Sequence, residues 1–549
     1  MSSYLYRILA ITSIAFATSG CNKQLIEDPK SSLTPQYFST AQGFQSGLDA
    51  AYAGNRNLWG SENFMTMTVP GTDEFRSGSG GNTSFNIYSS SYDASSGFLS
   101  GVWNPCYTFI NTCNGIIDNG ATVSGLDANT VKQKVAEAKF LRANYYFLLV
   151  RFFGPVTLNK NFISEPSTSA NRAPIAEVYN FIVQDLKEAI AALPPSPTLN
   201  GVLPGKATAA AASHLLAKVY LTRAYSSAKQ ADDFKNAYDT AKGLIDKIAT
   251  LNLGLLPDFG AVFAEGNEAS KEILWSVQHT PNLTYNAISN ELNFHYVMGY
   301  ENFPGLVRSM AYGRPYGRVQ LTNWLGNVCF ADKINDTRYY KTFQTVWLSN
   351  SADKIPKVNG VPKYALGDTA IFMPGVDVTD AKINSTRYSL VPPRKYTLQL
   401  FPTMTKYQDT KRAGINDASV RPIMVYRLAE TYLLAAEAAV NLNDNINAAK
   451  YVNIVRARAA YPNGDLAAMT VTPAQMTLDY VLDERARELC GEQTRWLDLV
   501  RTNKLVERVK LYNPDAAVNI QEKHILRPIP QSQIDRIITG DKYPQNKDF

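Results

Sequence analysis

Apolar residues recur at three- and four-residue spacing in several long segments of this 549-residue chain. Within 130–153, for example, Val131, Val135 and Ala138 fall on one face, and Gly154 follows the segment directly. This period predicts amphipathic helices that end at Gly or Pro. The segments with this pattern are 130–153, 175–193, 206–225, 234–249, 421–442, 446–460, 473–490 and 494–509.

The predicted helices come in pairs joined by short turns. The placement of Ala and Tyr in LLAKVYLTRAY and YLLAAEAAV resembles helical-hairpin repeats of the tetratricopeptide type. Stacked hairpins of this type bury a continuous core and leave a concave surface. We therefore predict a mainly α fold, a tetratricopeptide-like helical-hairpin scaffold with large irregular insertions that form a ligand-binding lobe.

Two stretches lack a sustained helical period. One is rich in Gly, Ser and Asn, and the other is punctuated by Pro and Gly and rich in Tyr. Segments of such length are not expected as bare loops in a compact domain. We predict a single unit over 21–549, with a helical scaffold at 35–54, 102–250 and 421–512, an irregular lobe at 55–101 and 251–420, and a C-terminal segment at 513–549.

The N-terminus carries Arg7, then the apolar run ILAITSIAFA, and then TSGC, which ends at Cys21. A membrane-spanning helix needs ~20 apolar residues, so this shorter run predicts a secretory signal over 1–20. The small residues before Cys21 resemble the lipobox of a bacterial lipoprotein, with Thr18 in place of the usual Leu; the alternative is ordinary cleavage with Cys21 incidental. We predict a lipid on Cys21 that attaches the protein to a membrane.

The net charge of +6 results from 54 basic and 48 acidic residues. Spread over this length it is weak, and the sequence shows no Lys/Arg block of the kind that nucleic-acid-binding proteins carry. We therefore expect no nucleic-acid partner.

Few groups are arranged for catalysis. The four histidines show no metal-ligand spacing, and the chain contains neither a GxSxG elbow nor a GxxxxGK[ST] loop. Cys106 and Cys113 lie seven residues apart in an expected helix, a rise of ~10.5 Å that is too long for a disulfide. We predict free thiols, no metal site and no catalytic residue.

Acidic and basic residues crowd the segment 482–501, LDERARELCGEQTRWLDLVR. On a helix, Asp483 and Glu484 lie one turn from Arg487, where side chains pair. Pairing lowers the pKa of a carboxylate, which is the wrong direction for a general acid near neutral pH. We interpret the segment as a structural joint between helices, with Trp496 packed between them.

A set of motifs runs in order through nearly the whole chain. They are IEDPKSSLTPQYF after Cys21, AKFLRANYYFLLVRFFGPVTL (138–158), GKATAAAASHLLAKVYL (205–221), DTRYYKTF (336–343), RPIMVYRLAETYLLAAEAAV (421–440), VNIVRARAA (452–460), YVLDERARELCGEQTRWLDLVR (480–501) and HILRPIPQSQID (524–535). Together they resemble the SusD/RagB-like outer-membrane nutrient-binding lipoproteins of Bacteroidetes. The ending KYPQNKDF departs from that family's usual Gln-Asn-Pro-Gly-Tyr close.

The resemblance implies a tetratricopeptide-like scaffold with a less regular ligand-binding lobe, and a role without catalysis. It implies capture of an oligosaccharide, or in some members a peptide, and delivery to a partner TonB-dependent SusC-like transporter. It also implies a lipid-anchored, surface-exposed protein of the outer membrane, with no cofactor other than a structural calcium ion of the kind that some relatives carry.

Two irregular segments, 71–78 and 300–324, combine aromatic rings with polar groups. Sugars stack their apolar C–H faces on rings and bind their hydroxyls to polar side chains, whereas core packing is the alternative interpretation of each aromatic. From these segments we expect ligand contacts at Asp73, Arg76, Tyr300, Tyr312, Arg314, Tyr316 and Trp324.

Other functions remain open at the level of sequence. The ligand is a peptide if the protein resembles the RagB-like members. A surface glycoside hydrolase would need two facing carboxylates, such as Asp73 and Glu74, but adjacent acids on an extended chain point in opposite directions. A further alternative is a structural tetratricopeptide adaptor that binds only protein.

Overall fold

The computed structural model describes residues 35–197, 204–282, 286 and 289–549. The predicted signal segment 1–20 and the predicted lipid-carrying Cys21 lie outside these residues, so both stay predictions. Within the described part of the chain, no helix is both long enough and apolar enough to span a membrane.

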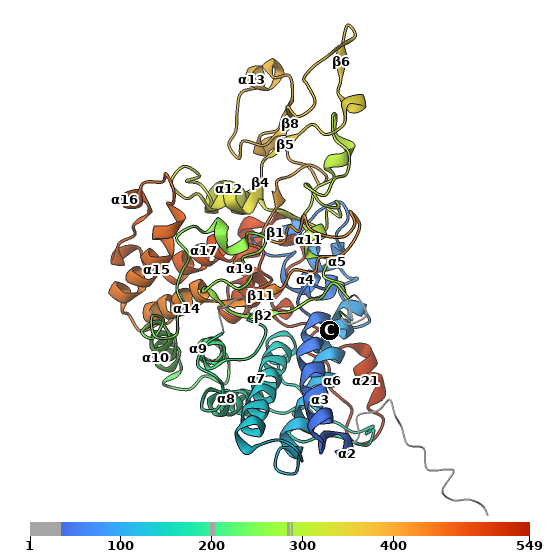
Figure 1. The fold of residues 1–549 in the computed structure, drawn as a ribbon, viewed down its shortest axis with the longest axis vertical. Coiled ribbons are helices and arrows are strands. Elements are labelled where there is room, and N and C mark those ends of the chain that lie inside the picture. The colour runs from blue at the N-terminus through green and yellow to red at the C-terminus, as the bar shows by residue number, and fades with distance from the viewer. Residues whose placement is uncertain (1–34, 198–203, 283–285, 287–288) are drawn as a thin grey trace, which may run out of the picture.

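The main helices form the scaffold of the structure (Figure 1). They are α3 (Ala41–Ala53), α6 (Gly97–Asn119), α7 (Ala128–Phe153), α8 (Ile175–Ile190), α9 (Ala209–Ala224), α10 (Asp233–Ile245), α14 (Leu428–Asn441), α15 (Asn445–Ala459), α17 (Leu478–Glu488), α18 (Arg495–Arg501) and α19 (Leu505–Tyr512). Consecutive helices from α6 to α10 pack on one another, and α10 packs on α14, which pairs with α15. This succession confirms the predicted mainly α fold of helical hairpins.

Shorter helices flank and connect these helices. They are α2 (Pro35–Phe38), α4 (Glu62–Thr68), α5 (Thr83–Ile87), α11 (Leu292–His295), α12 (Arg338–Thr342), α13 (Asp380–Ser385), α16 (Leu466–Met469), α20 (Pro514–Ala517) and α21 (Gln531–Arg536). Among them, α4 packs against both α6 and α18, so it joins the N-terminal helices to a helix from near the end of the chain.

Local capping explains where α7 begins and ends. The Asp127 carboxylate accepts hydrogen bonds from the backbone N–H groups of Asn129 and Thr130, both at 3.0 Å, in the first turn. At the other end Gly154 has a φ of 71°, which glycine adopts without a Cβ clash. Pro155 cannot continue a helix, so α7 ends where the sequence predicts.

Two of the predicted helices are wrong in part. The segment 421–442 begins as strand β11 (Ile423–Arg427), and α14 follows it. Buried β-branched and aromatic residues favour the strand, which pairs antiparallel with β2 (Ile273–Val277). The segment 494–509 divides into α18 and α19 near Asn503, whose φ of 57° is a left-handed conformation that ends a helix.

Short strands tie the irregular segments together. Strand β1 (Phe75–Ser77) pairs antiparallel with β3 (Val319–Leu321), and β4 (Phe343–Gln344) pairs with β10 (Thr403–Met404). Between β4 and β10 the chain forms an arm (345–402) that protrudes at the top of Figure 1. The arm holds the pair β6 (Lys357–Val358) and β7 (Val361–Pro362), and a sheet in which β8 (Thr369–Phe372) lies between β5 (Val346–Leu348) and β9 (Ser389–Leu390).

Buried arginines and carboxylates form an ion-pair cluster around Glu488, which we call the Glu488 cluster. Glu488, on α17, accepts hydrogen bonds from Arg427, at the end of β11, and from Arg458, on α15. It also accepts one from Arg338, on α12, at 3.0 Å. Burial alone would raise the pKa of Glu488, but the three guanidiniums outweigh it and lower the pKa to about 2. The cluster thus joins elements that are far apart in the sequence.

The segment 482–501 is built as a joint, although not in every detail as predicted. Arg487 pairs with Glu484 at 2.9 Å, one turn away, as expected. Asp483 does not pair with Arg487; it pairs with Arg508 of α19, because Arg487 is already held by Glu484. Trp496 is fully buried, and its ring stacks on Phe152 of α7 with 5.7 Å between ring centroids. The predicted packing of Trp496 is therefore confirmed.

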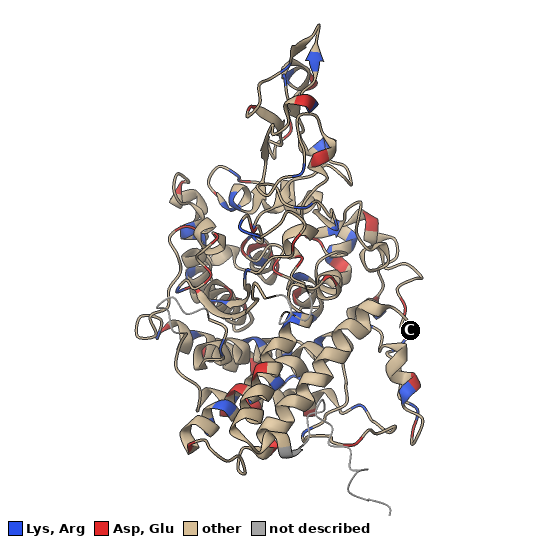
Figure 2. Ribbon diagram, turned by 45° about the vertical axis from the view of Figure 1, so that its right-hand side comes forward, with Lys and Arg blue, Asp and Glu red and all other residues tan. Residues whose placement is uncertain are grey.

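Two further features of the structure are the distribution of charged residues and the state of the cysteines. Figure 2 shows the basic and acidic residues interspersed along the described ribbon. Cys106, Cys113, Cys329 and Cys490 are free and buried, as predicted. Burial raises the pKa of Cys329 to about 12, so this thiol is kept in its unreactive, protonated form.

Candidate ligand-binding site

The pairing of β1 with β3 brings the two predicted ligand segments, 71–78 and 300–324, into contact. Phe75 lies opposite Leu321, and Arg76 lies opposite Gln320. These residues are about 245 positions apart in the chain, and only the fold makes them neighbours. The two segments therefore lie side by side in the fold.

Asp73 does not face a ligand, contrary to our expectation. It is fully buried, and its two oxygens accept hydrogen bonds from Arg495, both at 2.7 Å, and from Arg508 at 2.6 Å. Burial favours a raised pKa, but the two arginines outweigh it and hold the pKa of Asp73 below its usual value. Asp73 instead fixes the chain before β1 to helices α18 and α19.

Glu74 is also buried, and it lies 3.4 Å from the nearest Arg495 nitrogen. Burial raises the pKa of Glu74 to about 8; Arg495 opposes this shift and the charge of Asp73 adds to it. With both side chains closed off by protein, Asp73 and Glu74 cannot flank a sugar bond in this conformation.

We expect Glu74→Gln to reduce the loss of stability as pH rises from about 4.5 to 8. The folded pKa lies above the value of 4.5 expected for an unfolded chain, so the contribution of neutral Glu74 is complete below pH 4.5 and is lost as pH rises through 8. The amide stays neutral throughout. Thermal unfolding followed between about pH 4 and 9 should show a smaller fall in midpoint for the variant than for the wild type. Parallel curves would contradict the assignment.

The aromatic candidates Tyr300 and Trp324 are packing residues. The hydroxyl of buried Tyr300 donates to the Gly313 carbonyl at 2.7 Å. Trp324 is 3% exposed, and it stacks on Tyr512 with 5.0 Å between ring centroids. The expected ligand contacts at these two positions are therefore replaced by contacts within the protein, the alternative interpretation of each aromatic.

Tyr312 and Arg76 also have protein partners. The half-buried Tyr312 hydroxyl donates to the Leu348 carbonyl at 3.0 Å and accepts from the Leu348 N–H at 2.7 Å, which fixes the arm to the segment before β3. Arg76 forms a partly exposed ion pair with Asp515 at 3.3 Å. Both side chains are thus engaged by contacts within the protein.

Arg314 and Tyr316 are half-buried and lie together on the surface beside β3. The guanidinium carbon of Arg314 is 4.8 Å from the centroid of the Tyr316 ring, and that of Arg318 is 5.2 Å away. The ring of Phe294, on α11, lies 5.2 Å from the same centroid. Phe294 is buried, so the Tyr316 ring and the Arg314 and Arg318 guanidiniums are the flat groups at this surface, and such groups stack against a sugar face.

A cavity of about 230 Å³ lies next to this surface. Arg318 connects the two, because its Nε is 3.1 Å from the Glu62 carboxylate at the cavity wall. Burial and the neighbouring charge of Glu62 raise the pKa of Glu291, another wall residue, against the opposing effect of nearby arginines. The residues that line the cavity are Ser61, Glu62, Asn63, Ser289 and Glu291.

We call this cavity and the Arg314–Tyr316–Arg318 surface the polar cleft. Its carboxylates, amide and hydroxyls can accept or donate hydrogen bonds to hydroxyl groups of a ligand. The cavity residues were not predictable from the sequence, because they are isolated polar residues without a motif. A signal for Arg318 was present in YGRPYGR (312–318), where it follows Tyr316 as Arg314 follows Tyr312.

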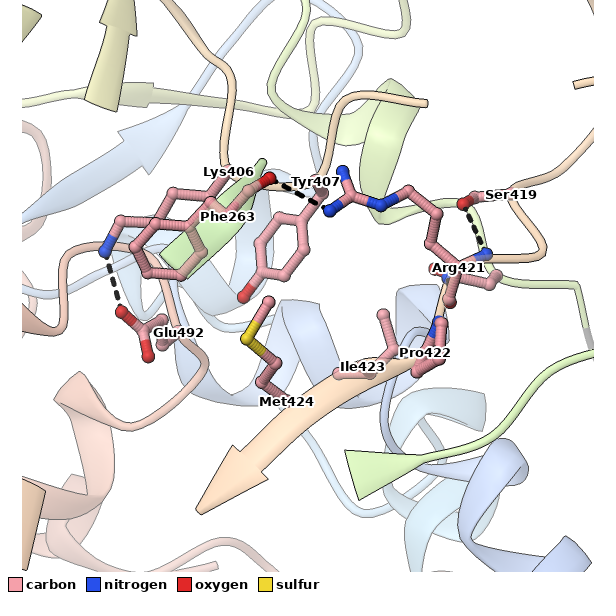
Figure 3. Close-up of a pocket in the computed structure, with 10 residues that line it drawn as sticks. Phe263, Lys406, Tyr407, Ser419, Arg421, Pro422, Ile423, Met424 and Glu492 are labelled. Carbon is pink, nitrogen blue, oxygen red and sulfur yellow. Dashed lines mark hydrogen bonds and ion pairs between the residues drawn. The ribbon is translucent and has the colours of Figure 1, made fainter. Parts of the chain in front are cut away.

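Another pocket, shown in Figure 3, is too small for a sugar. Lys406 bonds to Glu492 across it at 2.7 Å, and Arg421 donates to the Phe263 carbonyl at 2.9 Å. The free volume left is about 10 Å³, room for at most one water molecule. These side chains serve the local packing of β11.

Two family models match most of the chain between them. Residues 325–548 match the model of the SusD family, and residues 27–221 match a second model described as starch-binding associating with outer membrane. The chain belongs to the SusD family. The motifs from which the resemblance was inferred fall largely within these two ranges, so the predicted SusD/RagB-like membership is confirmed.

The relatives of this SusD-family protein span its length. SusD-like protein P2 of Formosa agariphila is 26% identical over 88% of both chains. Among solved structures, a SusD homolog from Bacteroides thetaiotaomicron VPI-5482 superposes with a TM-score of 0.72 at 21% identity, covering 94% of this chain and 98% of its own. A laminarin-binding SusD-like protein superposes with a TM-score of 0.65 at 23% identity, covering 93% and 100%. These structures share the fold of this SusD-family protein.

Proposed function

We propose that this protein is a nutrient-binding lipoprotein of the cell surface that captures an oligosaccharide in the polar cleft. The observation that carries the proposal is the cavity lined by Glu62, Asn63 and Glu291 next to the ring of Tyr316. Stacking on a ring and hydrogen bonds from fixed polar groups are the two contacts that a sugar needs. The laminarin-binding relative and the starch-binding family description support this ligand class.

We further propose that the protein delivers its ligand to a partner TonB-dependent SusC-like transporter. The lipid predicted on Cys21 would hold it at the outer membrane, in keeping with the membrane named in the description of the family model. In this role the protein binds and releases its ligand unchanged. The buried state of Asp73 and Glu74 supports a function without catalysis.

Tyr316→Ala is expected to weaken oligosaccharide binding by about tenfold, because it removes one stacking surface. Isothermal titration calorimetry of the purified protein with laminarin- and starch-derived oligosaccharides measures the change. Tyr340→Ala is a matched control, since Tyr340 is 47% exposed on α12 and does not line the polar cleft.

Three outcomes would contradict the proposal. Equal affinity of the Tyr316→Ala and wild-type proteins would exclude the polar cleft as the ligand site. Binding of peptides but not of oligosaccharides would favour a RagB-like peptide ligand. Sustained cleavage of an oligosaccharide by pure protein, lost in Glu291→Gln, would favour a glycoside hydrolase instead.

A further inference from the structure

A second cavity, of about 310 Å³, lies in the helical layer. It is bounded by the last turn of α7, the first turn of α8, the C-terminal end of α9 and helix α18, and it shares no lining residue with the polar cleft. Its walls are mainly apolar, and a pocket of this volume is large enough for a small organic molecule. The apolar wall residues include Val150, Ile175, Leu497, Val500 and Leu526.

One wall residue of this cavity is a buried arginine without a counter-ion. Arg151 is 9% exposed, and its Nε donates to the Phe147 carbonyl of its own helix at 3.1 Å. Its guanidinium carbon lies 4.0 Å from the Phe147 ring centroid. Among the described residues, no carboxylate lies within ion-pair distance of Arg151, and its two terminal nitrogens have no hydrogen-bond acceptor.

Arg501, which lines the same cavity, is also a buried arginine, but it has carboxylate partners. Arg501 lies 2.8 Å from Glu437 and 3.0 Å from Asp498, so its charge is neutralised within the protein. Burial lowers the pKa of Arg151 to about 10, which still leaves it positively charged at neutral pH. A buried charge without a partner is unfavourable, and an anion that enters the cavity would relieve this cost.

We propose that this cavity binds a small carboxylate with an apolar body. The two oxygens of a carboxylate match the two terminal nitrogens of the Arg151 guanidinium, and the aliphatic wall residues match an apolar body. A single unpaired guanidinium balances one negative charge, which favours a monocarboxylate over a phosphate monoester. The carboxylate belongs either to a free acid or to the C-terminus of a short peptide.

Calorimetric titration of the full-length protein separates these sources. Hexanoate tests the free acid, and a tripeptide that ends in leucine tests the peptide terminus. Hexanamide and the amidated tripeptide lack the charge, and acetate lacks the apolar body. We expect the charged form of at least one pair to bind at least about tenfold more tightly than its amide and than acetate, because a charge-assisted hydrogen bond to a buried group is lost in the amide.

Two variants test whether the probes bind in this cavity. Arg151→Met keeps an unbranched aliphatic stem, although a shorter one, and removes the unpaired charge; it should lower affinity for the charged probe by about 10- to 100-fold without lowering the unfolding temperature. Ile175→Trp keeps Arg151 but fills the cavity, and should also weaken binding. Tyr316→Ala, in the polar cleft, should leave it unchanged. The proposal is overturned if neither charged probe binds, or if Arg151→Met binds hexanoate and the tripeptide as the wild type does.

Discussion

Replacing Glu488 with Gln is expected to lower the free energy of unfolding by about 3–5 kcal/mol, the usual effect of removing one partner from a buried ion-pair group. Arg338, Arg427 and Arg458 all converge on this carboxylate. Gln keeps the size of the side chain but leaves these guanidiniums with less compensating charge. Urea unfolding of both proteins at neutral pH measures the difference.

The effect of pH distinguishes loss of charge from loss of packing. The folded pKa of Glu488, about 2, lies below the value of 4.5 expected for an unfolded chain, so the carboxylate stabilises the fold above pH 4.5 and this contribution is lost as pH falls through 2. The gap between wild type and Glu488→Gln should therefore narrow in acid. Glu507→Gln removes an exposed ion pair with Lys504 and should cost less than about 1 kcal/mol. A Glu488 variant as stable as the Glu507 variant would contradict a structural role for the cluster.

Asp73→Asn is expected to lower the free energy of unfolding by a similar amount, about 3–5 kcal/mol. Arg495 and Arg508 share this one buried carboxylate, and Asn can accept fewer hydrogen bonds and carries no charge. Thermal and urea unfolding at neutral pH measure the loss. The variant also decides between the two roles that have been considered for Asp73.

A residue that contacts ligand would change affinity with little change in stability, whereas the structural role predicts the reverse. We expect the fraction of Asp73→Asn that is folded to keep the oligosaccharide affinity of the wild type. Asp515→Asn is the control, because its partly exposed pair with Arg76 should be worth less than about 1 kcal/mol. If Asp73→Asn has normal stability but has lost oligosaccharide affinity, Asp73 is a ligand-binding residue and not a structural one.

Helices were predictable from the sequence where their signals are local. The limits of α7 follow from Asp127 at one end and Gly154 with Pro155 at the other. Strand β11 was missed because its strand character depends on pairing with β2, about 150 residues away in the chain. The break at Asn503 was missed because the apolar period continues through it. Local signals thus identified helices better than they identified their interruptions.

The candidate site was predictable as a region and only in part as residues. Tyr316 and Arg314 lie at the polar cleft, whereas Asp73, Tyr300 and Trp324 are buried, because the composition of a segment does not reveal which side chains turn inward. Glu62 and Glu291 are brought together by folding alone, since they lie more than 200 positions apart. Their electrostatic coupling is visible only in three dimensions.

The contact between Asp73 and Arg495 spans 422 positions of the chain. The chain is synthesised from its N-terminus, so the residues before β1 are made long before the arginines that neutralise them. Arg527 is synthesised later still, and it donates a hydrogen bond to the Tyr92 hydroxyl at 2.8 Å. Contacts this distant in sequence slow folding, because the intervening chain must be ordered first. A product terminated before residue 495 therefore lacks the guanidiniums that neutralise Asp73, directly before the strand beside the polar cleft.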